Sequence, residues 1–104
     1  MADLKARLIA ELRKIEGMED RPSAVAGGTA LFYRGKELAH FHNGNELDLR
    51  LTRKVISALG LEHPRDSVHH PNRSRNSPWI EIRFNDARET TMLVSLVRRA
   101  AAEL

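Results

Sequence analysis

The sequence predicts a single α+β domain, in which helices cover one face of an antiparallel four-stranded sheet, in the order α-β-β-β-α-β-α. Apolar residues recur at helical spacing near both ends of the chain, which predicts a helix at each end. Between these helices, short runs that suit strands are separated by turn signals. The 104 residues are enough for one hydrophobic core, and we expect one domain over residues 1–104.

The first element is expected to be an amphipathic helix over residues 3–16. With the two residues before it, this helix forms the N-terminal segment, residues 1–16. Gly17 is suited to end this helix. Residues 17–28 contain Pro22 and several glycines, and we expect them to form a connection. The apolar residues at helical spacing are Leu4, Leu8, Ile9, Leu12 and Ile15.

Three strands are expected next, over residues 30–33, 37–42 and 46–51. Arg34-Gly35-Lys36 is expected to turn between the first two, and Asn43-Gly44 is the strongest hairpin signal in the chain. The third strand alternates strictly, so its two faces differ in polarity. Leu47, Leu49 and Leu51 occupy one face, and Glu46, Asp48 and Arg50 occupy the other.

Thr52 can cap a short helix that ends at Gly60. The loop from His69 to Trp79 follows, and its two prolines predict a shaped loop rather than a flexible one. A fourth strand is expected over residues 79–84. Asp86 and Glu89 are then spaced as a capping box for a final helix, whose buried stripe would comprise Met92, Leu93, Leu96, Val97 and Ala100.

Strand alternation divides the predicted sheet into an apolar face and a polar face. His40 and His42 fall on the polar face with Asp48, as do Leu38 and Trp79. We expect this face to be partly open to solvent or to a partner. The opposite face is expected to form a core from Phe41, Leu47, Leu49, Ile82 and Phe84, packed against Leu8, Leu12, Ile56, Leu93 and Leu96.

The histidines of the polar face suggest a metal site. Two histidines at positions i and i+2 of a strand project side by side, and a third imidazole with a carboxylate would complete a tetrahedral shell. The expected ligands of zinc or another divalent metal are His40, His42, His70 and Asp48. The alternative is an exposed sheet face with ordinary cross-strand pairs, such as a histidine with Asp48.

Two further binding hypotheses involve the loop. An unknown small molecule could stack on Trp79, with charge from Arg50, Arg73 or Arg75; His69 could also reach this surface. Alternatively, Trp79 is partly buried and simply fixes the loop. A nucleic acid could instead bind Arg65, Arg73 and Arg75, and the net charge of +3 permits this. Affinity for nucleic acid should then fall steeply with salt.

Composition narrows the remaining classes. The chain has no cysteine, which excludes disulfides and thiolate chemistry. No apolar run approaches the roughly 20 residues of a membrane span, and the first residues lack the apolar core of a signal peptide. We therefore expect a cytoplasmic protein without a membrane partner. Catalysis has less support, because no elbow glycines surround Ser74 and Ser77 and no glycine-rich phosphate loop is present.

Several of these residues resemble a known family. The strand Glu37-Leu-Ala-His-Phe-His42, Asp48 with Arg53 after it, and His69-His70 leading to Trp79 are similar to the small bacterial and fungal family labelled luciferase domain, whose function is otherwise unknown. The resemblance covers residues 25–100, and Ala39 and Pro78 stand where the family tends to have glycine. The positions it singles out are His40, His42, Asp48, Arg53, His70 and Trp79.

The resemblance implies two alternative functions. The family label suggests a histidine-dependent enzyme of oxygenase type. The order of elements also resembles the MmcQ/YjbR-like domains, which are often described as DNA-binding-like, although a likeness of fold does not by itself transfer a function. Binding of a small molecule or a metal on the polar face is the interpretation that the residues favour.

Overall fold

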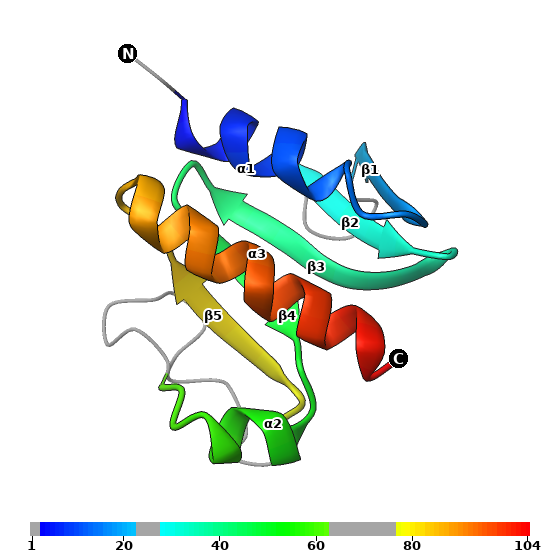
Figure 1. Cartoon of the computed structure of the whole chain (residues 1–104), viewed down its shortest axis with the longest axis vertical. Helices are drawn as coiled ribbons and strands as arrows, with labels where there is room; N and C mark the ends of the chain where they lie inside the picture. The colour runs from blue at the N-terminus through cyan, green and yellow to red at the C-terminus, as the bar shows by residue number, and fades with distance from the viewer. Residues whose placement is uncertain (1–2, 23–27, 63–76) are drawn as a thin grey trace.

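A computed structural model describes residues 3–22, 28–62 and 77–104 of the chain, and it has the predicted α+β class (Figure 1). The five strands form one antiparallel sheet in the order β1-β2-β3-β4-β5. Helices α1 and α3 lie side by side across one face of this sheet, and α2 lies at one end of it (Figure 1). The elements are α1 (Leu4–Leu12), β1 (Met18–Pro22), β2 (Thr29–Tyr33), β3 (Lys36–Asn43), β4 (Glu46–Arg50), α2 (Arg53–Ala58), β5 (Trp79–Arg83) and α3 (Ala87–Ala102).

The sheet has one strand more than the sequence predicts. Strand β1 lies within residues 17–28, which we expected to form a connection, and it pairs with β2 from Met18 opposite Tyr33 to Pro22 opposite Thr29. Its three central residues are charged and it ends in proline, a composition typical of an edge strand. An edge strand of this kind has no alternating apolar pattern, which is why the sequence did not reveal it.

Helix α1 ends at Leu12 rather than at residue 16. After Leu12 the chain tightens, because the amides of Lys14 and Ile15 donate to carbonyls three residues earlier, at 3.2 and 3.0 Å. Gly17 follows with a φ of +89°, a conformation that favours glycine. This turn brings Met18 into position to start the edge strand.

The core lies between the sheet and the two long helices, as predicted. Phe41 and Phe84 are fully buried there, with ring centroids 6.1 Å apart and planes at 83°. Ile82 and Leu96 are partly buried against this core. Met92 is 61% exposed, so its place in the predicted stripe is wrong. The stripe of α3 consists of Leu93, Val97 and Ala100, and the other predicted core residues that are buried are Leu8, Leu12, Leu47, Leu49 and Ile56.

An irregularity in β3 corrects the predicted place of Leu38. Leu31 pairs with Ala39 whereas Phe32 pairs with Glu37, so Leu38 is an extra residue on its strand. Its side chain is fully buried in the hydrophobic core, and it does not lie with the histidines as simple alternation predicted. The same shift places the carboxylate of Glu37 on the histidine face.

The predicted caps of both later helices are present. The hydroxyl of Thr52 accepts a hydrogen bond from the amide of Val55 at 3.2 Å, at the start of α2. The carboxylate of Asp86 accepts from the amide of Glu89 at 2.9 Å, at the start of α3. The Glu89 carboxylate accepts a hydrogen bond from the amide of Asn85 at 2.9 Å. In a standard capping box this bond comes from the N-cap residue itself, which here is Asp86, one residue later.

A surface ion pair joins the turn after α1 to the edge strand. Arg13 donates from Nε and Nη2 to the two carboxylate oxygens of Asp20, at 2.7 and 2.9 Å. These hydrogen bonds, aided by charge attraction, lower the pKa of Asp20 below its ordinary value. Because the pKa is depressed in the folded state, the pair stabilises the fold above the unfolded pKa of about 3.9, and this stabilisation is lost as the pH falls through the folded value.

Replacing this carboxylate should therefore have a small effect that depends on pH. We expect Asp20→Asn to lower the free energy of unfolding at pH 7 by less than about 1 kcal/mol, since the pair is on the surface. At acidic pH, as Asp20 becomes protonated in the folded state as well, the difference between the variant and the wild type should shrink. Urea unfolding at pH 7 and at an acidic pH measures this, with the exposed Glu16→Gln as control. An equal loss at both pH values would contradict the assignment.

Candidate metal centre

A row of cross-strand partners builds the site on the face opposite α1 and α3. His40 of β3 pairs with Asp48 of β4, and Asp48 pairs in turn with Glu81 of β5. In the neighbouring row, Glu46 of β4 pairs with Arg83 of β5. Residues directly opposite one another project from the same face of a sheet. Three strands therefore bring their charged side chains to one place.

The predicted histidines and aspartate converge on a single carboxylate oxygen. Nε2 of His40 lies 3.2 Å from Oδ2 of Asp48, and Nε2 of His42 lies 3.8 Å from the same oxygen. The two imidazole centroids are 5.3 Å apart. One possible ligand atom from each of these residues lies within 4.8 Å of the others. Three of the four predicted metal ligands are thus together; His70, the fourth, lies outside the described residues, as does His69.

His42 is also held by a carboxylate that sequence reasoning did not assign to the site. Its Nδ1 lies 2.8 Å from Oε2 of Glu46. The other carboxylate oxygen, Oε1, accepts a hydrogen bond from Nε of Arg83 at 3.1 Å, and Nη2 of the same guanidinium lies 3.1 Å from it as an ion pair. Glu46 lies four residues after His42, on the other side of the predicted Asn43-Gly44 hairpin. It is two residues before Asp48, so both side chains lie on the same face of the strand. That spacing was the signal that would have identified it.

The polar face, which we expected to be partly open to solvent or to a partner, is buried at its centre. There Glu46, Asp48 and Glu81 are only 2%, 2% and 1% exposed, so these three residues do not belong to an open surface. Burying a carboxylate is costly unless it is hydrogen-bonded and paired with a cation. Here His40, His42 and Arg83 contact the carboxylates of Asp48 and Glu46. These contacts offset the loss of hydration.

Trp79 borders the cluster as predicted. Its ring centroid lies 5.4 Å from that of His40, with the planes inclined at 41°. Its backbone amide donates to the hydroxyl of Ser77 at 3.1 Å, which also fixes the start of β5. Arg53 is the first residue of α2 and is exposed, and no contact among the described residues joins it to the cluster. The predicted nucleic-acid residues, Arg65, Arg73 and Arg75, lie outside the described residues.

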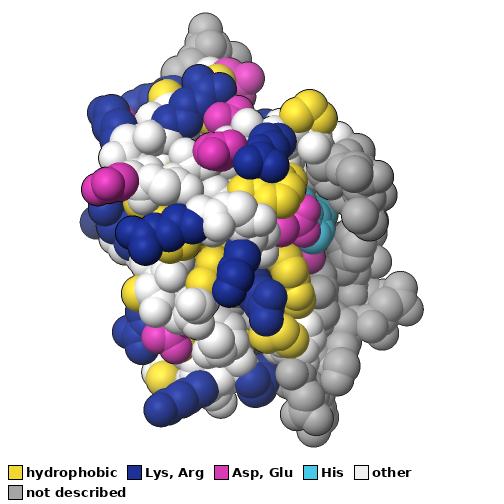
Figure 2. Space-filling view, turned by 90° about the vertical axis from the view of Figure 1, so that its right-hand side faces the viewer, with side chains coloured by type: hydrophobic (Ala, Val, Ile, Leu, Met, Phe, Trp, Pro, Cys, Tyr) yellow, Lys and Arg dark blue, Asp and Glu magenta, His cyan; other side chains and the backbone are white. Residues whose placement is uncertain are grey.

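Surface charge gives no further site on the side drawn in Figure 2. Histidine and acidic side chains adjoin one another there beside hydrophobic ones, whereas Lys and Arg are scattered over the rest of that side. Among the helices that the structure describes, none is long and apolar enough to cross a membrane.

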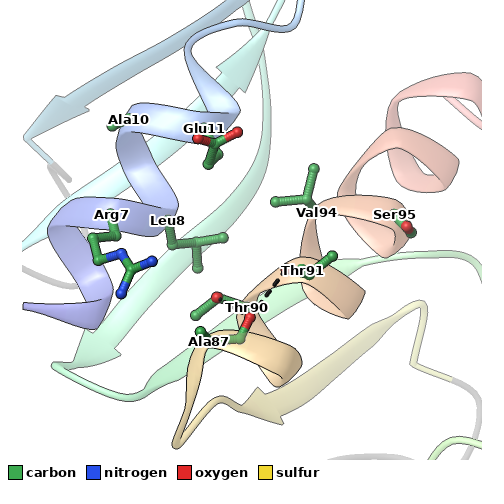
Figure 3. A pocket seen from close by; sticks show the side chains of 9 residues that line it. All are labelled: Arg7, Leu8, Ala10, Glu11, Ala87, Thr90, Thr91, Val94 and Ser95. Carbon is green, nitrogen blue, oxygen red and sulfur yellow. Dashed lines mark hydrogen bonds between the residues drawn. The ribbon is translucent and has the colours of Figure 1, made fainter.

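A separate groove of about 400 Å³ lies between α1 and α3, on the opposite side of the sheet from the histidines. Leu8 and Val94 face each other across it, and the hydroxyls of Thr90 and Thr91 donate to the carbonyl of Ala87 at one end (Figure 3). Arg7 and Glu11 line the side formed by α1. None of the predicted site residues lines this groove.

Comparison with known proteins identifies the family. The sequence profile of the family described as "Luciferase domain" matches residues 35–100, from the turn before β3 almost to the end of α3. Comparisons with curated proteins and with solved structures find no match. The matched segment covers more than half of the chain and contains His40, His42, Asp48 and Trp79. This chain therefore belongs to the luciferase domain family.

Proposed function

We propose that this domain binds a divalent transition-metal ion through His40, His42 and Asp48. The observation that carries the proposal is the approach of two imidazole Nε2 atoms to one carboxylate oxygen, at 3.2 and 3.8 Å. With metal–ligand bonds of about 2.1 Å, neighbouring ligand atoms lie roughly 3.0–3.4 Å apart. The two distances to Asp48 differ from this range by only a few tenths of an ångström, and all three donor atoms lie within 4.8 Å of one another.

An ordinary cross-strand pair accounts for only part of this geometry. A structural contact between His40 and Asp48 would explain the 3.2 Å distance, since the two residues are directly opposite each other. It does not require a second imidazole near the same oxygen. The buried carboxylates around the site also favour a cation there, because charge interactions are stronger away from bulk water.

The donor set favours a particular group of metals. Imidazole nitrogen suits zinc, iron, cobalt and nickel, whereas magnesium and calcium prefer oxygen ligands. Three protein ligands would leave at least one coordination position for water or for a small molecule, as in catalytic zinc sites. The ring of Trp79 beside His40 would form a flat wall near that position. A metal and a small molecule can therefore share this site.

Metal titration tests the proposal directly. We expect metal-stripped protein to bind one Zn²⁺ per chain with a Kd of about 1 μM or tighter by calorimetry. Because Trp79 is the only tryptophan and lies beside His40, Co²⁺ or Ni²⁺ should also quench the intrinsic fluorescence. His40→Ala should weaken binding by about a hundredfold or more, since a ligand is lost.

The control for this titration is Asp20→Asn, which removes a carboxylate from the edge strand, away from the histidines. Its affinity for zinc should equal that of the wild type. A wild-type Kd no tighter than about 1 mM, or equal binding by His40→Ala, would refute the metal site.

A further inference from the structure

We infer that Glu46 and Arg83 are positioning residues of this metal centre, and that they make His42 bind through Nε2. The inference rests on the proposed function and extends it beyond the three ligands. Each member of the chain of contacts comes from a different strand: His42 from β3, Glu46 from β4 and Arg83 from β5.

The contact between His42 and Glu46 determines which ring nitrogen carries the proton. An ionised carboxylate can only accept hydrogen bonds, so at 2.8 Å from Oε2 the proton of a neutral imidazole belongs on Nδ1. The lone pair then lies on Nε2, the atom that is 3.8 Å from Asp48. A carboxylate that accepts from the far nitrogen of a ligating histidine fixes its tautomer and ring orientation.

Arg83 contacts the Glu46 carboxylate on the side away from His42. Its Nε donates to Oε1 of Glu46 at 3.1 Å and its Nη2 forms an ion pair with the same oxygen, while Oε2 faces His42. The Glu46 side chain is 3% exposed whereas that of Arg83 is 30% exposed, so the guanidinium closes the outer end of the chain of contacts. Rotation of the carboxylate would cost the hydrogen bonds on both sides of it.

The other histidine provides an internal comparison. A carboxylate also lies near Nδ1 of His40, but the distance to Oε1 of Glu37 is 3.7 Å, which is too long for a hydrogen bond. The Glu37 side chain is also more exposed, at 34%. If a nearby negative charge were sufficient, Glu37 would contribute measurably as well, although less than Glu46 because water screens its charge more. If a hydrogen bond is needed, only Glu46 contributes strongly.

Matched substitutions separate these cases. Glu46→Gln keeps the shape of the side chain, but one of the two oxygens becomes an NH2 group, which donates and cannot accept from Arg83 or from His42 at that position. We expect Zn²⁺ affinity to fall about ten- to hundredfold, the usual effect of losing such a partner. Glu37→Gln should change it by less than about threefold. Co²⁺-loaded Glu46→Gln should also have an altered visible absorption spectrum, because the ligand geometry changes.

Arg83→Met provides a second variant that leaves Glu46 in place. It should weaken Zn²⁺ binding in the same direction, and combining it with Glu46→Gln should add little, because both act through one imidazole. Affinities are measured at a temperature where circular dichroism shows each variant folded. If Glu46→Gln is not folded, Arg83→Met decides alone.

The possible failures are distinguishable. If the wild type binds no metal, the metal centre itself is refuted and this inference with it. If the wild type binds zinc while Glu46→Gln and Arg83→Met bind within about threefold of it, only the positioning role is refuted. An equal loss in Glu37→Gln and Glu46→Gln would also refute it, because that result assigns the effect to nearby charge.

Discussion

Leu49→Asp is expected to leave the domain unfolded at 25 °C. Leu49 of β4 is fully buried, and it pairs with Ala39 on one side and Ile80 on the other. The substitution removes roughly 2 kcal/mol of hydrophobic burial. It also places a carboxylate without a hydrogen-bond partner in the core, which costs several kcal/mol, roughly. The sum approaches the whole stability of a typical domain, about 5–15 kcal/mol.

Two controls separate the faces of this strand. Arg50→Asp changes the next residue, which is exposed, and should alter stability by about 0.5 kcal/mol or less. His42→Ala should remain folded but lose about 1–3 kcal/mol, because Oε2 of the buried Glu46 would lose its contact with His42. Circular dichroism and thermal melts measure all three variants. A melt of Leu49→Asp within a few degrees of the wild type would show that the core face is misassigned.

Saturating zinc is expected to raise the melting temperature by about 10–20 °C. A ligand that binds only the folded state at a hundred times its Kd adds about 2.7 kcal/mol to the free energy of unfolding. In a domain of this size, each kcal/mol corresponds to a shift of roughly 4–8 °C. His40 and His42 are close in sequence and can bind some zinc in the unfolded chain, which favours the lower end of the range.

Scanning calorimetry with and without zinc measures this shift. His40→Ala should show almost none of it, and Mg²⁺ should not replace Zn²⁺ because the donor set contains two imidazoles. The same zinc-induced shift in His40→Ala would mean that the ion acts elsewhere on the chain. No shift in the wild type at a zinc concentration shown by titration to saturate the site would mean that binding does not depend on the fold.

Features that depend on the period of the backbone could be predicted from the sequence. Side chains alternate along any strand, so Leu47 and Leu49 on the core side place Asp48 on the other side. The same period puts His40 and His42 together on the face opposite Phe41. The Asp86 cap is likewise a short-range pattern, and the structure contains it.

Features that depend on strand pairing and on the burial of side chains were decided only by the tertiary structure. Strand β1 has little apolar pattern and exists because β2 supplies its hydrogen bonds. The irregularity at Leu38 depends on how β2 and β3 pair, since alternation within one strand cannot show an extra residue. The contact between Glu46 and Arg83 joins residues 37 positions apart, through the pairing of β4 with β5. Alternation sets the face on which a side chain lies, but its distance from residues on other strands, and whether water reaches it, depend on the assembled sheet and what packs against it.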